Sequence, residues 1–314
     1  MSTYCVIGSL YYSLTTKCKD FPQPGDHIQV DDLRPSFGGQ GGNIAVALAK
    51  FGAKVSFIGK VGSDSFGKAY IESLQKLGVQ VADIKAEPKC STGMALVNID
   101  ASGHETELLY AGANGKLDNA YLSLHADTLR QCDYLLLQGD IPAETALLAK
   151  ELARKAGKTV FLDPGINTKY PAVIYDMLDY ITPNQEETKA LTGIDVVDKA
   201  SAKRAATWFK KKGVQHVVLT CGDQGLYYFD RQGGQHFSAY RDLKVVDTTD
   251  AGDIFNAAFA FAIGRGDDVQ DAVYFAQAAA AVSIQHKGGA QASLPSLMQI
   301  EILCNSQLLD NSTI

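Results

Sequence analysis

Two hydrophobic patterns alternate along most of this chain. From residue 43 onward, segments with apolar residues at helical spacing alternate with short segments that are continuously apolar. Continuous apolar runs are typical of strands buried on both faces of a sheet. Such runs occur at 55–61, 134–137, 159–162 and 216–219, and helical patterns at about 64–78, 143–156, 185–192 and 199–212. The alternation predicts an α/β fold with a doubly wound, mostly parallel sheet flanked by helices.

Two segments interrupt this alternation, at 9–36 and at about 90–112. They read as short strands with alternating apolar and polar residues, including 94–99 and 105–110 on either side of a turn at 100–103. A hairpin with one polar face is not wholly core, so we expect it to cover a site as a small β-sheet lid. No proline- or serine-rich linker and no internal repeat divides the chain, so we expect one domain over 1–314.

Composition and charge argue against several classes of protein. The net charge is −6 and the only basic run, at 210–212, lies at a predicted helix end, so we expect no nucleic-acid partner. No apolar run approaches the roughly 20 residues that span a bilayer, and the N-terminus lacks the features of a signal peptide. The six cysteines have neither zinc-site nor disulfide spacing, which fits a cytoplasmic protein.

The segment 247–253 is a turn of small and acidic residues that runs straight into the apolar stretch 254–261. A turn that opens a helix exposes unpaired backbone N–H groups and the positive end of the helix dipole, so it can bind an anion. Asp253 would lie beside that anion, where a carboxylate can take a proton from an attacking hydroxyl. Ala251 and Gly252 would supply backbone donors. A simple capped helix start explains the same residues equally well.

A second glycine cluster, at 37–43, leads into a predicted helix that ends at Gly52. Its glycines allow close backbone approach to a ligand, and Asn43 offers both a donor and an acceptor. Together the two motifs resemble the two signatures of the PfkB/ribokinase family of carbohydrate kinases. The resemblance covers nearly the whole chain, through 181–187, 220–225 and 287–290, and is strongest to the ribokinases.

The resemblance implies ATP-dependent phosphorylation of the primary hydroxyl of a small sugar, ribose or a related pentose. Asp253 would be the general base and the turn of Ala251 and Gly252 the anion hole. The lid would cover the sugar and carry the contact of a homodimer. The implied sugar-binding residues are Tyr11, Ser13, Gly39, Gln40, Asn43, Asp140 and Asp253.

The same resemblance implies sites for the nucleotide and for cations. The implied ATP-binding residues are Asn184, Thr220, Gly222, Gly225 and Gln277, and Glu187 would help to place Mg²⁺. A monovalent cation such as K⁺ is implied at Asp247, Thr249, His286, Gly288 and Ser293, although the loop at 288–293 is one glycine longer than in the family. Purely structural interpretations of these residues stay open. Asn184 and Glu187 could form a capping box, Gly222 and Gly225 could make a hairpin turn, and Gln277 could belong to a tight helix packing.

The chain departs from the family at four positions. Tyr11 and Ser13 stand where ribokinases have Asn and Asp, and Gln40 replaces a lysine. These changes predict a more apolar pocket that favours acceptors with fewer hydroxyls, or acceptors with an apolar or ring substituent that Tyr11 could cover. Asp250 replaces a small residue in the anion-hole turn, where its charge would oppose the transition state unless it points to solvent.

Other functions therefore stay open. The acceptor could be deoxyribose, a ketohexose, a keto-deoxy sugar acid or a nucleoside, and the chain could also be a catalytically weak sugar or nucleotide sensor.

Two further glycine motifs resemble nucleotide-binding signatures but do not complete them. Residues 62–69 nearly match a P-loop, but Ala69 stands where Ser or Thr is required, so we expect a capped turn there. Residues 38–42 do not make a dinucleotide fingerprint, because Ile44 falls where the third glycine belongs.

Overall fold

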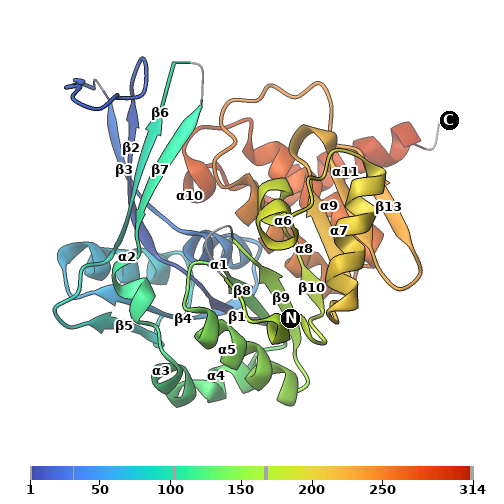
Figure 1. Cartoon of the computed structure of the whole chain (residues 1–314), viewed down its shortest axis with the longest axis horizontal. Helices are drawn as coiled ribbons and strands as arrows, with labels where there is room; N and C mark the ends of the chain where they lie inside the picture. Colours follow the sequence, from blue (N-terminus) through green and yellow to red (C-terminus); the bar gives the residue numbers. More distant parts are fainter. Residues whose placement is uncertain (1, 31, 102–103, 166–168, 312–314) are drawn as a thin grey trace.

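The computed structural model describes residues 2–30, 32–101, 104–165 and 169–311, and its centre is a nine-stranded sheet (Figure 1). The strand order is β13-β12-β11-β10-β9-β8-β1-β4-β5. The strands are β1 (Thr3–Ile7), β4 (Lys54–Gly62), β5 (Ile84–Glu87), β8 (Tyr134–Gln138), β9 (Thr159–Asp163), β10 (Tyr180–Ile181), β11 (His216–Thr220), β12 (Leu226–Phe229) and β13 (Gly234–Phe237). Pairing is parallel from β5 to β11 and antiparallel at β12 and β13. The predicted α/β fold is confirmed.

Helices cover both faces of this sheet. They are α1 (Gln40–Lys50), α2 (Ser65–Lys76), α3 (Asn119–Leu124), α4 (Ala126–Gln131), α5 (Ala143–Lys155), α6 (Gln185–Thr192), α7 (Lys199–Lys211), α8 (Ala251–Arg265), α9 (Val269–Ser283), α10 (Gly289–Ser293) and α11 (Leu297–Asn311). Short 3₁₀ turns lie at Gly112–Lys116, Ala172–Tyr175 and Gly222–Gln224. Along β1, Val6 packs into the core under α1, α8 and α9, whereas Cys5 and Ile7 pack into the core under α5 and α7. Burial on both faces explains the continuous apolar runs.

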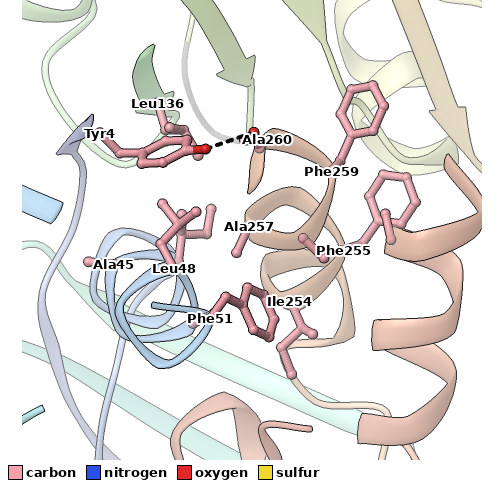
Figure 2. Close-up of a cluster of buried hydrophobic side chains, with 14 of the residues drawn as sticks. Tyr4, Ala45, Leu48, Phe51, Leu136, Ile254, Phe255, Ala257, Phe259 and Ala260 are labelled. Carbon is pink, nitrogen blue, oxygen red and sulfur yellow. Dashed lines mark hydrogen bonds between the residues drawn. The ribbon is translucent and has the colours of Figure 1, made fainter. Parts of the chain in front are cut away.

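The packing of α1 against α8 holds the two glycine motifs together. Figure 2 shows Leu48 of α1 on the side toward Ala257 of α8, and the Tyr4 hydroxyl lies 3.4 Å from the Ala260 carbonyl oxygen. Leu48 is fully buried in this contact. Shortening such a leucine to alanine typically costs about 2–5 kcal/mol, so this packing fixes the relative position of the helix starts firmly.

A second sheet of four strands forms the predicted lid, blue and teal in Figure 1. Its order is β3 (Leu33–Gly38), β2 (Tyr11–Lys17), β6 (Gly93–Ile99) and β7 (Glu105–Tyr110), with β2 and β6 parallel and the outer pairs antiparallel. The prediction of strands throughout 9–36 was too broad, because residues 18–30 form no strand. In the predicted turn at 100–103, Ser102 and Gly103 lie outside the described residues, and the Asp100 N–H donates to the His104 carbonyl at 3.0 Å.

The near match to a P-loop is a capped turn, as expected. Asp64 is the N-cap of α2, and its carboxylate accepts hydrogen bonds from the Gly67 N–H at 2.9 Å and from the Thr92 N–H at 2.7 Å. The turn therefore ties α2 to the base of the lid. Within the described part of the chain, no helix is long and apolar enough to cross a membrane.

Candidate active site

A cavity of about 1330 Å³ opens between the inner face of the lid and the carboxyl ends of the parallel strands. Ligands collect at these strand ends in doubly wound sheets. The cavity brings together many residues that the sequence singled out. Those in its lining are Tyr11, Ser13, Gly39, Gln40, Asp140, Asn184, Glu187, Asp247, Thr249, Gly252, Asp253 and Gly288.

Asp253 lies in the first turn of α8 and is 6% exposed. Asn43, in the first turns of α1, donates a hydrogen bond from Nδ2 to Asp253 Oδ2 at 2.8 Å. Burial and the nearby charge of Asp250 raise the pKa of Asp253 well above its ordinary value. A carboxylate with a raised pKa is a stronger proton acceptor, so Asp253 has the chemistry of a general base. The other amide atom, Asn43 Oδ1, is buried without a hydrogen-bond partner among the described residues.

The first turn of α8 also presents backbone donors to the cavity. The Ala251 N–H donates to the Thr248 carbonyl at 3.3 Å within the turn, and its part in binding an anion stays a prediction. The N–H groups of Gly252 and Asp253 occupy the first-turn positions that a helix leaves without intrahelical partners. A Cβ added to Gly252 would meet no described atom within 4 Å, so there is open space beside this turn.

Asp250 is the residue just before α8 and has a left-handed backbone, with φ of 60° and ψ of 11°. This conformation is unfavourable for residues with a Cβ, although aspartate tolerates it better than most. Asp250 lines the cavity and contributes to the raised pKa values of both Asp253 and Glu105. The charge of Asp250 therefore acts on other carboxyl groups inside the cavity and is not directed wholly to solvent.

Asn184 and Glu187 form a capping box at the start of α6, so the structural interpretation of this pair is confirmed. Asn184 Oδ1 accepts from the Glu187 N–H at 2.8 Å, and Glu187 Oε2 accepts from the Asn184 N–H at 2.8 Å. Burial, together with the charges of Asp140 and Glu186, raises the pKa of Glu187 to about 7. Both residues also line the cavity, so the cap does not remove them from the site.

Four predicted nucleotide-binding residues lie outside the lining of this cavity: Thr220, Gly222, Gly225 and Gln277. Thr220 pairs with Asn184 through a β-bridge, so it adjoins the cavity wall. Gly225 has φ of +87°, and a Cβ there would lie 2.0 Å from the Phe237 carbonyl oxygen, which confirms its structural role in the hairpin. Gln277 Nε2 donates to the Ser238 carbonyl at 3.3 Å, so Gln277 and Gly225 both adjoin the segment 237–239.

Asp247 joins the turn before α8 to the loop before α10. Its Oδ1 accepts from the Thr249 N–H at 3.0 Å and its Oδ2 accepts from the Gly288 N–H at 3.1 Å. Burial opposes ionisation of Asp247, but these hydrogen bonds prevail and its pKa is lowered. The His286 ring points back to the Val282 carbonyl, with Nδ1 at 3.1 Å. Among the described residues, no group of three His, Cys, Asp or Glu side chains forms a metal site.

The sequence reasoning missed a buried polar pair behind Asp253. Asp163 ends β9, and its Oδ2 accepts a hydrogen bond from Asn256 Nδ2 at 2.8 Å. Burial and the charges of Glu187 and Asp253 raise the pKa of Asp163 well above its ordinary value. Two signals were available: Asp163 directly follows the apolar run 159–162, and Asn256 lies three residues after Asp253 on one helix.

It also missed the charged residues on the inner face of the lid. Lys17, Arg34, Glu105 and Glu107 all line the cavity. They occupy alternate positions on their strands together with Tyr11 and Ser13, so the period of two in the lid strands would have placed them on this face.

Comparison with known proteins agrees with this geometry. Residues 1–297 match the model of the pfkB family carbohydrate kinases. The ribokinase of Haemophilus influenzae is 34% identical over 294 residues, covering 94% of this chain and 95% of the relative. A deoxyribokinase of Salmonella typhi is 32% identical over 94% of this chain and 96% of the relative. The structure of Arabidopsis thaliana ribokinase complexed with ribose and ATP superposes with a TM-score of 0.88 and 29% identity, covering 96% of this chain and 98% of that one.

The fold and the family match define the protein as an ATP-dependent carbohydrate kinase. The chain belongs to the pfkB family of carbohydrate kinases. The resemblance recognised in the sequence is therefore confirmed, including its ribokinase-like sheet and lid.

Proposed function

We propose that this protein transfers the γ-phosphoryl group of ATP to the primary hydroxyl of a small sugar, ribose or a closely related pentose. The observation that carries the proposal is the buried carboxylate of Asp253, held by Asn43 beside the first turn of α8 in the main cavity. Relatives named ribokinase and deoxyribokinase, each at least 32% identical, support this class of acceptor.

In this mechanism the acceptor hydroxyl lies against Asp253 and gives it its proton as the oxygen attacks the γ-phosphorus. A bond forms between that oxygen and phosphorus, the bond from phosphorus to the β–γ bridging oxygen breaks, and ADP leaves. The N–H groups of Gly252 and Asp253 stabilise the charge on the transferring group. Asn43 keeps the carboxylate aimed at the hydroxyl. The rest of the sugar would contact Tyr11, Ser13, Gly39, Gln40 and Asp140.

Nucleotide and metal would lie on the other side of the transferring phosphoryl group. Thr220, Gly222, Gly225 and Gln277 would hold the nucleoside, next to Asn184. Glu187 and Asp163 are buried carboxyls whose pKa values are raised partly by neighbouring carboxyls. Buried carboxyls of this kind fit a hard divalent cation bound with phosphate oxygens, so these two residues would hold Mg²⁺, directly or through water. The ion would neutralise charge on the phosphates.

A monovalent cation such as K⁺ would bind where Asp247, Thr249 and Gly288 converge, with His286 and Ser293 contributing backbone or hydroxyl oxygens. The hydrogen bonds of Asp247 hold the two loops together, which supports this location. Turnover measured in K⁺ and in an organic cation of equal ionic strength tests the assignment. Equal rates in both would contradict it.

We further propose that two copies pair through the outer face of the lid. Leu14, Leu96 and Leu108 lie side by side on this face, in one row across β2, β6 and β7. Leu96 is 42% exposed and Leu108 is 67% exposed, and exposed apolar patches on a sheet mark interaction surfaces. Leu108→Glu should shift the protein from dimer to monomer in sedimentation velocity. An unchanged sedimentation coefficient, or a monomeric parent protein, would contradict the proposal.

The deciding experiment measures ATP consumption with a panel of acceptors: ribose, deoxyribose, a ketohexose, a keto-deoxy sugar acid and a nucleoside. We expect the highest kcat/KM for ribose or a closely related pentose. The sensor hypothesis is favoured by one observation, the charge of Asp250 inside the cavity. Sugar binding by calorimetry without turnover on any acceptor would support the sensor and overturn the kinase proposal.

A further inference from the structure

Glu107 lies on the inner face of the lid and lines the main cavity. It lies on β7 in a cross-strand row with Val97 of β6, Thr15 of β2 and Arg34 of β3. The neighbouring row toward the base of the lid contains Leu109, Ala95 and Ser13. Glu107 and Ser13 therefore face the same cavity from the same sheet, two strands apart.

The surroundings of Glu107 connect it to the predicted sugar site. Tyr11 packs on Ala95 and Val97. Burial raises the pKa of its phenol, and the charges of Asp140 and Glu107 raise this pKa further. The charge of Asp140, which lies in the loop after β8, also raises the pKa of Glu107. The charge of Glu107 from the lid and that of Asp140 from the main sheet thus act on the same phenol, that of Tyr11.

We propose that Glu107 is a specificity-determining residue of the acceptor site, which binds ring hydroxyls of the sugar from the lid while Asp140 binds them from the main sheet. This inference rests on the proposed function. The Glu107 carboxyl takes the place of the carboxylate that the family resemblance predicts at position 13, where this chain has Ser13. The cavity is therefore not apolar at this end. The acceptor class is then a pentose that retains its vicinal hydroxyls, with ribose preferred over its 2-deoxy form.

The ionisation of Glu107 suits this role. Glu107 is solvent-exposed, and desolvation by the surrounding cavity walls together with the charges of Glu105, Asp140 and Asp250 raises its pKa to about 7. The cations on the same face of the lid are Lys17 and Arg34, and Arg34 is already paired with Asp32 at 2.5 Å. Near neutral pH the Glu107 carboxyl can therefore donate or accept a hydrogen bond, and a pair of carboxyls can bind two adjacent hydroxyls.

The test compares steady-state kinetics for ribose and 2-deoxyribose in the full chain, its Glu107→Gln variant and its Glu107→Leu variant. We expect the KM for ribose to rise roughly tenfold or more, because a lost hydrogen bond to a charged group is worth about that factor. The KM for ATP and the melting temperature should stay unchanged. The ratio of kcat/KM for ribose to that for deoxyribose should fall. Thr106→Gln, which places an amide on the opposite face of the same strand, is the matched control and should leave this ratio unchanged.

A relocation experiment adds a gain of function. Adding Ser13→Asp to Glu107→Gln returns one carboxylate to the inner face of the lid, and recovery of the ribose preference would support the inference. An unchanged ratio in both Glu107 variants, or an equal rise in KM for both sugars, would overturn it while leaving the proposed kinase intact. No turnover by the parent protein on any sugar would overturn the proposed function and the inference with it.

Discussion

Asn43 Nδ2 donates to Asp253 Oδ2 at 2.8 Å, and this bond joins residues 210 positions apart in the chain. It connects the first turns of α1 and α8, which pack directly against each other. Each glycine motif brings one partner, so neither motif is a complete site alone. The bond holds one carboxylate oxygen of Asp253, and in the proposed mechanism the other oxygen accepts the proton of the acceptor hydroxyl.

Asp253→Asn should lower kcat by about 10² to 10⁴, because it removes the proton acceptor while keeping the size of the side chain. ATP affinity should stay within a few-fold, since the nucleotide loops are untouched. Rapid-quench kinetics and ATP titration by calorimetry measure the two quantities. Asn43→Ala should lower kcat less, because it only loosens the aim of the base. Retention of most activity by Asp253→Asn would refute the general-base role.

Glu187 has a structural and a proposed metal-binding role, and two substitutions separate them. Glutamine keeps an oxygen that can accept from the Asn184 N–H, so Glu187→Gln should preserve the cap of α6 but raise the Mg²⁺ concentration for half-maximal rate. Glu187→Ala should also lose about 1 kcal/mol of stability. The measurements are rate against free Mg²⁺ and urea unfolding. If Glu187→Gln leaves the Mg²⁺ dependence unchanged, the residue is only a cap.

Stability of the ligand-free protein should fall as the pH rises from about 4.5 to about 7. The pKa of Glu187 is raised to about 7 by burial, and by Asp140 and Glu186, whereas in the unfolded chain it is near 4.3. The folded state therefore binds more protons than the unfolded state in this window, and its stability is lost as Glu187 ionises. Urea midpoints across this range measure the slope. Glu187→Gln should flatten it, and an identical slope in the variant would contradict the assignment.

The fold and the residues at the centre of the cavity were predictable from the sequence. Continuous apolar runs identified the parallel strands, motifs at strand and helix ends identified Asp253 and Asn184, and the family resemblance added Asp140. The pair of Asp163 and Asn256 was less accessible, because a hydrogen bond between a strand end and a helix depends on tertiary packing. Glu107 was missed for a related reason. A carboxylate on a strand reads as a solvated surface residue until the lid register shows which face it occupies.

Asp250→Gly should increase turnover, because it removes a negative charge from the turn that is proposed to stabilise the transferring phosphoryl group. Glycine adopts φ of +60° without the steric cost that a Cβ imposes, so stability should stay equal or rise by up to about 1–2 kcal/mol. Removal of the charge should also lower the pKa of Asp253, since Asp250 is the largest charge that raises it. The acid limb of the kcat/KM profile should therefore move to lower pH. A profile and rate unchanged by this substitution would show that Asp250 does not act on the base.

The last prediction concerns Tyr11 and Ser13, the positions where the resemblance to ribokinases leads us to expect Asn and Asp. Tyr11 is 4% exposed and packs on Ala95 and Val97, so replacing it removes buried apolar contact. Tyr11→Asn with Ser13→Asp should still raise kcat/KM for ribose, because a site built to bond sugar hydroxyls discriminates strongly for them. Ser13→Asp alone should give part of the gain without the packing loss, which makes it the control for folding. Glu107 lines the same cavity as Ser13, so the added carboxylate stands near an existing acidic group, and the gain should grow as the pH falls below about 7 and Glu107 becomes protonated. Kinetics for ribose at pH 6 and pH 8 in the three proteins measure this. A loss of activity on ribose at both pH values, in variants that remain folded, would mean that residues other than positions 11 and 13 bind the sugar.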